Sequence, residues 1–152
     1  MALPNRKTKE IITSIDQLIQ PKDQRYGRLL NWQNPGDPFW HYGIGLSNTH
    51  IFDTGKSWIG FRNENAKLVI GCEDIHLDPS EVMQRLRKAI CVFADWEYNF
   101  VGWNCEHLAR LITTDQARSY QSQPIWFLCN LTGKGDHKTA KQVFDNYPTI
   151  FF

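Results

Sequence analysis

Residues 104–111 read NCEHLARL, and this stretch makes the strongest prediction about fold and chemistry. Asn104 is a favoured N-cap residue, and apolar residues follow it at helical spacing, which predicts a helix that begins after Asn104 and ends near Thr114. Cys105 would occupy the first helical position, where free backbone N–H groups and the positive end of the helix dipole stabilise a thiolate and can receive an oxyanion. The stretch therefore predicts a nucleophilic cysteine, although a cysteine at a helix start is also often just a small buried side chain.

His107 is the histidine nearest to Cys105 in sequence, but it is badly placed to act as its base. Residues i and i+2 of a helix point about 200° apart. We therefore expect His107 to have a structural role close to the site. The base must come from another part of the chain, and the remaining histidines are His41, His50, His76 and His137.

A hairpin is predicted by residues 39–53, FWHYGIGLSNTHIFD, with a turn at 47–49. His41 and Asp53 are both odd-numbered, so a loop with an odd number of residues places them on the same face of the sheet. Asp53 could then hold the His41 ring as the third member of a triad. A two-residue turn would instead place His50 on the His41 face, and the sequence leaves both registers open. His41 also has an ordinary interpretation, as a hydrogen-bonded strand residue.

Further elements are predicted on both sides of this hairpin. Residues 11–19 carry an apolar stripe at helical spacing, which Pro21 ends. The stripe has no strongly basic face, so we expect this helix to pack on its own domain or on a second copy of the chain, and not to insert in lipid. Residues 31–40 predict a loop, and residues 66–71, AKLVIG, predict a strand.

The clearest helix is predicted by residues 78–97. Asp78 is a good N-cap, Pro79 suits the first helical position, and Glu81 completes a capping box. The segments PIWFLCNL and TGKGD, after Gln121, allow no assignment. Together the patterns predict one α+β domain over residues 1–152, with a small antiparallel sheet packed against helices. The buried stripe of the helix is expected to consist of Val82, Met83, Leu86, Ile90 and Phe93.

The composition is that of an ordinary globular protein, with 41% hydrophobic and 22% charged residues. The net charge of +1 argues against a nucleic-acid-binding surface. No apolar run reaches the roughly 20 residues of a transmembrane segment, and the N-terminus lacks the apolar part of a secretory signal. We therefore expect a soluble, cytoplasmic protein with reduced thiols. The four cysteines are Cys72, Cys91, Cys105 and Cys129.

Two motifs of the chain occur together in one known family. HYGIGL at 41–46 is followed twelve positions after its histidine by Asp53, and Tyr98 precedes the NCEH of 104–107 by the family's spacing. Over about residues 35–118 the chain resembles the lecithin:retinol acyltransferase-like family, whose members carry these motifs as an H-box and an NC-box. The resemblance implies a circularly permuted papain-like fold. It also implies catalytic roles for Cys105, His41 and Asp53, with Asn104, Tyr42, Tyr98 and His107 beside them or lining the substrate site.

The chain departs from the family pattern at three positions. Asp53 stands where family acyltransferases usually carry a second histidine, Gly45 replaces the tyrosine of the H-box, and Leu108 replaces the phenylalanine of the NC-box. The hydrophobic membrane anchor of the animal enzymes is also absent from the sequence. These departures bear on the lipid substrate more than on the fold.

The resemblance implies a cysteine-dependent acyltransferase or hydrolase that needs no cofactor. Cys105 would attack a carbonyl, His41 would accept its proton, and Asp53 would orient His41. The acyl-thioester would pass to water, an alcohol or an amine, and the substrate would be a small acyl-bearing molecule, either a lipid ester or an amide.

Two other functions compete with this one. The first is a non-catalytic binding or regulatory protein on the same fold, which keeps the NC-box for folding. The second is a metal site, which the spacing disfavours because neither cysteine–histidine pair matches a zinc motif. Its ligands would be Cys72, His76, Cys105 and His107.

Overall fold

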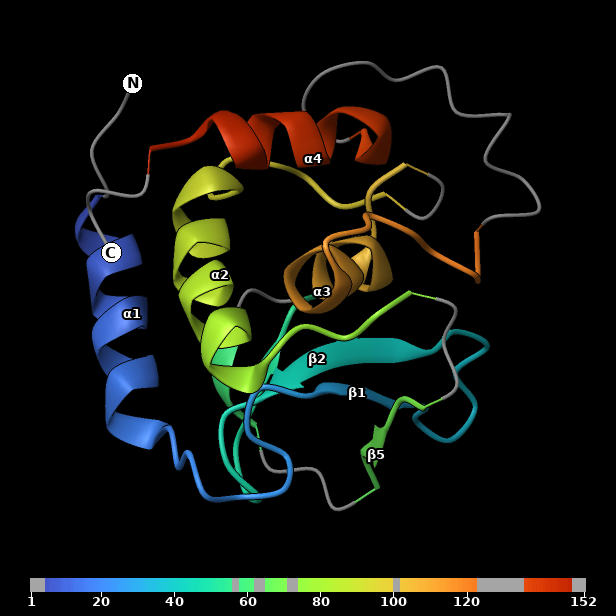
Figure 1. Cartoon of the computed structure of the whole chain (residues 1–152). Helices are drawn as coiled ribbons and strands as arrows, with labels where there is room; N and C mark the ends of the chain where they lie inside the picture. The colour runs from blue at the N-terminus through green and yellow to red at the C-terminus, as the bar shows by residue number, and fades with distance from the viewer. Residues whose placement is uncertain are drawn as a thin grey trace.

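The hairpin at residues 41–53 forms the middle of a small antiparallel sheet in a computed structural model of the chain (Figure 1). The structure describes residues 5–55, 58–61, 65–70, 74–99, 102–122 and 136–148, with the side chains of 58–61 left out. The elements, in chain order, are α1 (Arg6–Leu18), β1 (Leu29–Trp32), β2 (His41–Gly45), β3 (Ile51–Asp53), β4 (Trp58–Phe61), β5 (Lys67–Leu68), α2 (Pro79–Val92), α3 (Cys105–Thr114) and α4 (His137–Asn146).

The strands follow the order β4-β3-β2-β1-β5 across the described sheet, and each neighbouring pair is antiparallel. Gly43 pairs with Asp53, and Gly45 pairs with Ile51. Residues 46–50 form the loop between them, closed by the N–H of Leu46 donating to the His50 carbonyl at 2.9 Å. The loop therefore has an odd number of residues, and of the two registers that the sequence left open the structure has the one that places position 41 on the same face as Asp53.

The helices pack on one face of this sheet and form the main core with it. Ile44 and Phe52 come from the strands, and both are at most 1% exposed. Figure 1 shows α3 above β2, α2 beside α1, and α4 across the end of α2. Trp32 and Ile51 belong to a smaller cluster on the opposite face of the sheet. The predicted α+β class, with a small antiparallel sheet packed against helices, is confirmed.

Helix α1 begins earlier than the stripe predicted, because Asn5 caps it: its side-chain oxygen accepts from the N–H of Thr8 at 2.8 Å. Ile15 is fully buried in the core, while Ile11 and Leu18 are partly buried against it. The apolar face of α1 therefore packs on the domain, as expected. Among the described residues, no helix is both long and apolar enough to cross a bilayer.

Helix α2 begins at Pro79 as predicted, but the predicted capping box is wrong. The side chain of Asp78 accepts no backbone N–H of α2, and the Ser80 hydroxyl donates to its carboxylate at 3.2 Å instead. Most of the predicted stripe is buried, but Ile90 is only partly buried. The buried residues of α2 are Val82, Met83, Leu86, Ala89 and Val92.

Several elements were not predicted. Strand β1 includes Asn31 and Trp32, which the sequence placed in a loop, and β4 and α4 had no prediction at all. The predicted strand at 66–71 is reduced to Lys67–Leu68. The segment PIWFLCNL, and all of TGKGD except its aspartate, lie outside the described residues.

Candidate active site

Cys105 is the first residue of α3, and Asn104 caps that helix as predicted. The Asn104 side-chain oxygen accepts from the N–H of Glu106 at 2.9 Å and from that of His107 at 3.1 Å. The N–H of Asn104 donates in turn to Nδ1 of His107 at 2.9 Å, so the cap is reciprocal. His107 therefore holds the start of the helix, which agrees with the structural role expected for it.

The state of His107 follows from this cap. Because Nδ1 accepts a hydrogen bond, the proton of the neutral ring resides on Nε2. The ring is 2% exposed and stacks on His137, with centroids 4.5 Å apart. Burial, with a smaller contribution from His137, lowers the pKa of His107 to about 3. The cap therefore persists at every pH at which this ring stays neutral.

The pocket in front of Cys105 brings most of the predicted site residues together. It has a volume of about 350 Å³. Tyr42 lies outside its lining, in a small cluster with Leu29 and Ala109 under α3, and His107 lies outside it as well. The residues that line the pocket are His41, Asp53, Gly55, Tyr98, Asn99, Asn104 and Cys105.

The thiol of Cys105 is protonated in this arrangement. Burial is the main cause that raises the pKa of Cys105 to about 11; the carboxylates of Asp53 and Glu106 add to the increase, and hydrogen bonds with the backbone of Tyr42 and Glu106 oppose it. The Cys105 Sγ donates a long hydrogen bond to the Trp40 carbonyl at 3.9 Å. Burial therefore opposes the stabilisation of a thiolate that the helix start favours.

His41 is held by a residue that the sequence analysis missed. Its Nε2 lies 2.6 Å from Oδ2 of Asp37, and its ring stacks on Trp32 with centroids 5.9 Å apart. The N–H of Phe39 donates to the other carboxylate oxygen of Asp37 at 2.9 Å. This bond, followed by the bond with His41, lowers the pKa of Asp37. An ionised carboxylate only accepts, so Nε2 carries the proton and Nδ1 of neutral His41 is left as a proton acceptor.

From the sequence we expect Asp53 to hold the His41 ring, whereas in the structure Asp37 holds it. Strand alternation does not predict the position of Asp37, because that residue lies outside the strands, in the segment before β2. Only the i, i+4 spacing of Asp37 and His41 offered a signal. Among the described residues, no hydrogen bond joins His41 to the Cys105 thiol, although both line the same pocket.

The turn after β3 fastens the sheet to the start of α3. The Thr54 hydroxyl lies 2.8 Å from the carbonyl oxygen of Tyr42 and 2.9 Å from that of Cys105. Asp53 accepts from the N–H of Gly55 at 2.9 Å. A Cβ at Gly55 would lie 3.4 Å from the Cys105 Cβ, so this glycine leaves room in front of the cysteine. Tyr98 also holds this turn, because its hydroxyl donates a hydrogen bond to the Thr54 carbonyl oxygen.

A buried polar network behind the pocket fixes the backbone next to His41. Glu106 is fully buried and accepts from Arg110 Nε at 2.7 Å and from the Ser119 hydroxyl at 2.9 Å. The N–H of Gln121 reaches the same carboxylate at 3.2 Å. The Gln121 amide then binds both backbone groups of Trp40, accepting at 2.8 Å and donating at 3.1 Å. The i, i+4 spacing of Glu106 and Arg110 was the only sequence signal for this network.

The other histidines are engaged elsewhere. His50 lies in the hairpin loop, where its Nδ1 is 3.0 Å from the Thr49 hydroxyl. His76 Nε2 accepts from the N–H of Leu29 at 3.3 Å, and His137 Nδ1 bonds the Gly102 carbonyl at 3.0 Å. Within the ranges that the structure describes, which leave out Cys72, no group of three or more side chains is placed to bind a metal. His41 is therefore the candidate base that the fold brings to Cys105.

The chain matches no protein-family model, no curated protein and no solved structure. The functional interpretation rests on the two sequence motifs and on the geometry of the pocket that they line. Helix α3 supplies Cys105 and Asn104 to this pocket, and the hairpin supplies His41 and Asp53.

Proposed function

We propose that this protein is a cysteine-dependent acyltransferase or hydrolase that forms an acyl-thioester on Cys105. The substrate is a lipid ester or an amide. The observation that carries the proposal is the pocket that contains Cys105, at the first position of a capped helix, together with a histidine whose Nε2 is held by a carboxylate. These parts match the roles of nucleophile, general base and orienting residue in thiol enzymes. The resemblance to the H-box and NC-box motifs adds to the proposal independently.

The reaction begins from a neutral thiol and a neutral imidazole. As the Cys105 sulfur forms a bond with the carbonyl carbon, its proton passes to Nδ1 of His41, and Asp37 stabilises the resulting imidazolium. The imidazolium then returns the proton to the leaving alcohol or amine. Water or a second acceptor, deprotonated by His41, attacks the thioester, and the sulfur leaves and recovers a proton. His41 is not hydrogen-bonded to the thiol in the free protein, so substrate binding must bring the two groups together.

The oxyanion would form at the start of α3. The N–H groups of Glu106 and His107 donate hydrogen bonds to the side-chain oxygen of Asn104, and the N–H of Leu108 donates to the Asn104 carbonyl oxygen at 3.3 Å. Among the described residues, no group accepts a hydrogen bond from the N–H of Cys105. This group is the donor proposed for the oxyanion, and removing such a donor typically costs about 100- to 1000-fold in rate.

A matched pair of cysteines tests the proposal. Cys91 in α2 is partly buried, and burial raises its pKa to about 11, as for Cys105. Wild type, Cys105→Ser and Cys91→Ser should be incubated with a panel of aryl esters and amides of different chain length and examined by intact-mass spectrometry. We expect one acyl adduct in wild type and Cys91→Ser, and none in Cys105→Ser. An adduct that persists in Cys105→Ser would contradict the proposal.

The alternative is a non-catalytic binding or regulatory protein on the same fold. The raised pKa of Cys105 and the missing hydrogen bond from its thiol to His41 favour this alternative. It predicts no adduct with any ester or amide, and alkylation of Cys105 no faster than that of Cys91.

A further inference from the structure

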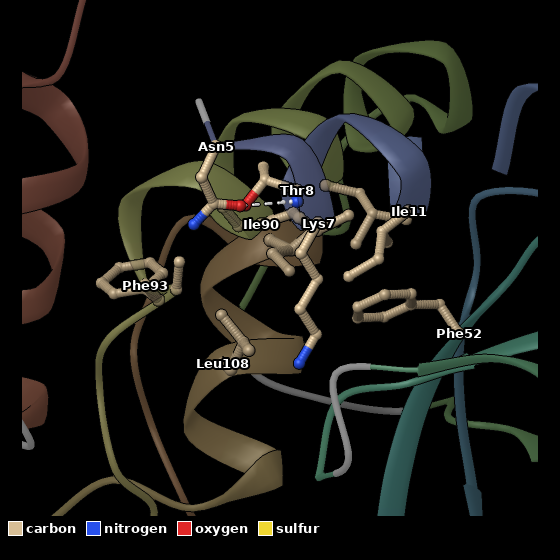
Figure 2. A pocket seen from close by; sticks show the side chains of 12 residues that line it. Asn5, Lys7, Thr8, Ile11, Phe52, Ile90, Phe93 and Leu108 are labelled. Atoms are coloured by element: carbon tan, nitrogen blue, oxygen red, sulfur yellow. Dashed lines mark hydrogen bonds between the residues drawn. The ribbon is translucent and has the colours of Figure 1, made fainter. Parts of the chain in front are cut away.

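A second pocket lies under α1, and it shares no lining residue with the pocket at Cys105. It encloses about 130 Å³ between α1, α2, α3 and the side chain of Phe52 in β3 (Figure 2). Most of its wall is apolar and belongs to the main core. Phe52, Leu86, Ala89, Leu108 and Ile112 are each at most 4% exposed, and Ile11, Ile90 and Phe93 complete the apolar wall.

One cationic residue, the exposed Lys7, is among those that line this apolar space. Figure 2 shows the Lys7 side chain running down from α1, with its ammonium group between Leu108 and Phe52. Among the described residues, no hydrogen bond or ion pair involves Lys7 Nζ. Arg6, its neighbour on α1, differs, because its Nε pairs with Glu10 at 2.9 Å. The Lys7 side chain is exposed, so its ammonium can pair with the anionic end of a ligand whose apolar part lies in the pocket.

The start of α1 adds to the same preference. Asn5 is the N-cap of α1 and lines the pocket, so the positive end of this helix dipole lies at the pocket. The side chain of Asn5 takes up the N–H of Thr8, as the dashed line in Figure 2 shows. The pocket thus combines an apolar interior with a positive potential from Lys7 and from the helix terminus.

We propose that this pocket binds a short aliphatic chain with one terminal anionic group, either a carboxylate or a phosphate monoester. The chain lies against Leu86, Ala89 and Ile112, and the anion pairs with Lys7. The size of the pocket limits the chain, since a cavity of about 150 Å³ accepts one benzene molecule. A chain of about five or six carbons matches the 130 Å³ enclosed here. The site is independent of the chemistry proposed at Cys105.

Binding can be mapped on the wild-type protein by NMR of methyl-labelled chain, with hexanoate, hexyl phosphate and 1-hexanol as probes. We expect saturable shifts of the Ile11, Ile90, Leu108 and Ile112 methyl signals with at least one anionic probe, and weaker binding of 1-hexanol. The carboxylate and the phosphate probe distinguish the two sources of the anion. Saturable binding of neither anionic probe, or shifts confined to other parts of the chain, would overturn the proposal.

A pair of lysine variants isolates the charge. Lys7→Gln should weaken binding of the anionic probe roughly 3- to 10-fold and leave 1-hexanol unchanged, since it removes a single charged partner. Lys9→Gln, on the same helix but outside the pocket lining, should change neither affinity. Ala89→Leu should fill the pocket and reduce binding of all three probes at least roughly 10-fold. Equal effects of Lys7→Gln and Lys9→Gln would contradict the assignment of the anion to Lys7.

Discussion

Helices α2 and α3 begin in similar sequence contexts, but their first turns are held differently. Asp78 precedes α2 and makes no cap bond, whereas Asn104 precedes α3, caps two N–H groups and receives a reciprocal cap from His107. Each helix carries one cysteine whose pKa burial raises to about 11, Cys91 in α2 and Cys105 in α3. Burial therefore does not distinguish the two thiols. What distinguishes Cys105 is its position at a helix start that is fastened to the sheet next to His41.

The largest expected difference between the two helices is in turnover. On any substrate that the wild type accepts, Cys105→Ser should lower kcat/KM by about 10⁴-fold or more, because a serine hydroxyl is far harder to deprotonate than a thiol. Cys91→Ser, in the last turn of α2, should stay within about two-fold of wild type. Circular dichroism should show both variants folded. Comparable losses in the two variants would mean that Cys105 acts through stability and not as a nucleophile.

The second largest effect concerns the carboxylate that holds His41. Asp37→Asn should lower kcat/KM roughly 10- to 1000-fold, which is about 1.4 to 4 kcal/mol of transition-state stabilisation, because the imidazolium loses its ionised partner. Asp53→Asn is the matched control. It preserves an oxygen for the Gly55 N–H and should cost less, since Asp53 raises the pKa of Cys105 and does not hold the ring.

Nitrogen-detected NMR of His41 provides a second measurement for this comparison. The proton should reside on Nε2 in wild type and in Asp53→Asn, and this preference should weaken in Asp37→Asn. A larger kinetic loss in Asp53→Asn than in Asp37→Asn would restore the triad expected from the strand parity.

The cap of α3 should make stability depend on pH. His107 has a pKa of about 3 in the folded protein, well below the ordinary value of 6.5 that applies to the unfolded chain. Between these values the unfolded chain binds a proton that the folded protein does not, so stability falls as pH falls below 6.5. The loss is about 1.4 kcal/mol per pH unit, or about 2 kcal/mol by pH 5.

Urea denaturation of wild type and His107→Gln across this pH range measures the effect. Glutamine at the third helical position can still accept the Asn104 N–H but does not titrate. His107→Gln should therefore lack this part of the pH dependence. An equally steep loss in both proteins would assign the acid sensitivity to other groups.

The smallest expected effect is on the free energy of unfolding, when the N-cap residues of the two helices are replaced in turn. Asn104→Ala should reduce the free energy of unfolding by about 2 kcal/mol, because it removes two cap bonds and the bond to Ser119 at a buried position. Asp78→Ala should cost less than about 0.5 kcal/mol, because Asp78 makes no cap bond. Chemical denaturation of both variants at neutral pH tests this, and equal losses would show that the reciprocal cap adds nothing.

Local patterns predicted those parts of the fold that depend on neighbours in sequence. The start of α3 follows from its capping residue, the start of α2 from Pro79 at the first helical position, and the hairpin around residues 46–50 from alternation and turn residues. Helix α4 escaped prediction because only Ala140 and Phe144 of it are buried, which is too short a stripe to recognise. Strand β1 escaped because its four residues run into a segment rich in turn residues.

The sequence predicted most of the residues of the site, but not the interactions between them. The motifs and the parity of the strands gave Cys105, His41, Asp53 and Asn104, which all line one pocket. The partner of His41 depends on how the turn before β2 folds back, and the raised pKa of Cys105 depends on what the rest of the chain packs around it. The spacing of a motif predicts neither the partner of His41 nor the pKa of Cys105.

Competitive alkylation tests most directly whether His41 activates Cys105. Iodoacetamide labelling rates of Cys105 and Cys91 should be measured by peptide mass spectrometry in wild type and in His41→Asn. Because burial raises both pKa values to about 11, burial alone predicts similar, slow labelling of the two thiols. Activation by His41 predicts that Cys105 reacts roughly 10- to 100-fold faster than Cys91 in wild type, and that this advantage disappears in His41→Asn. Equal rates in wild type, or an advantage of Cys105 that survives in His41→Asn, would contradict it.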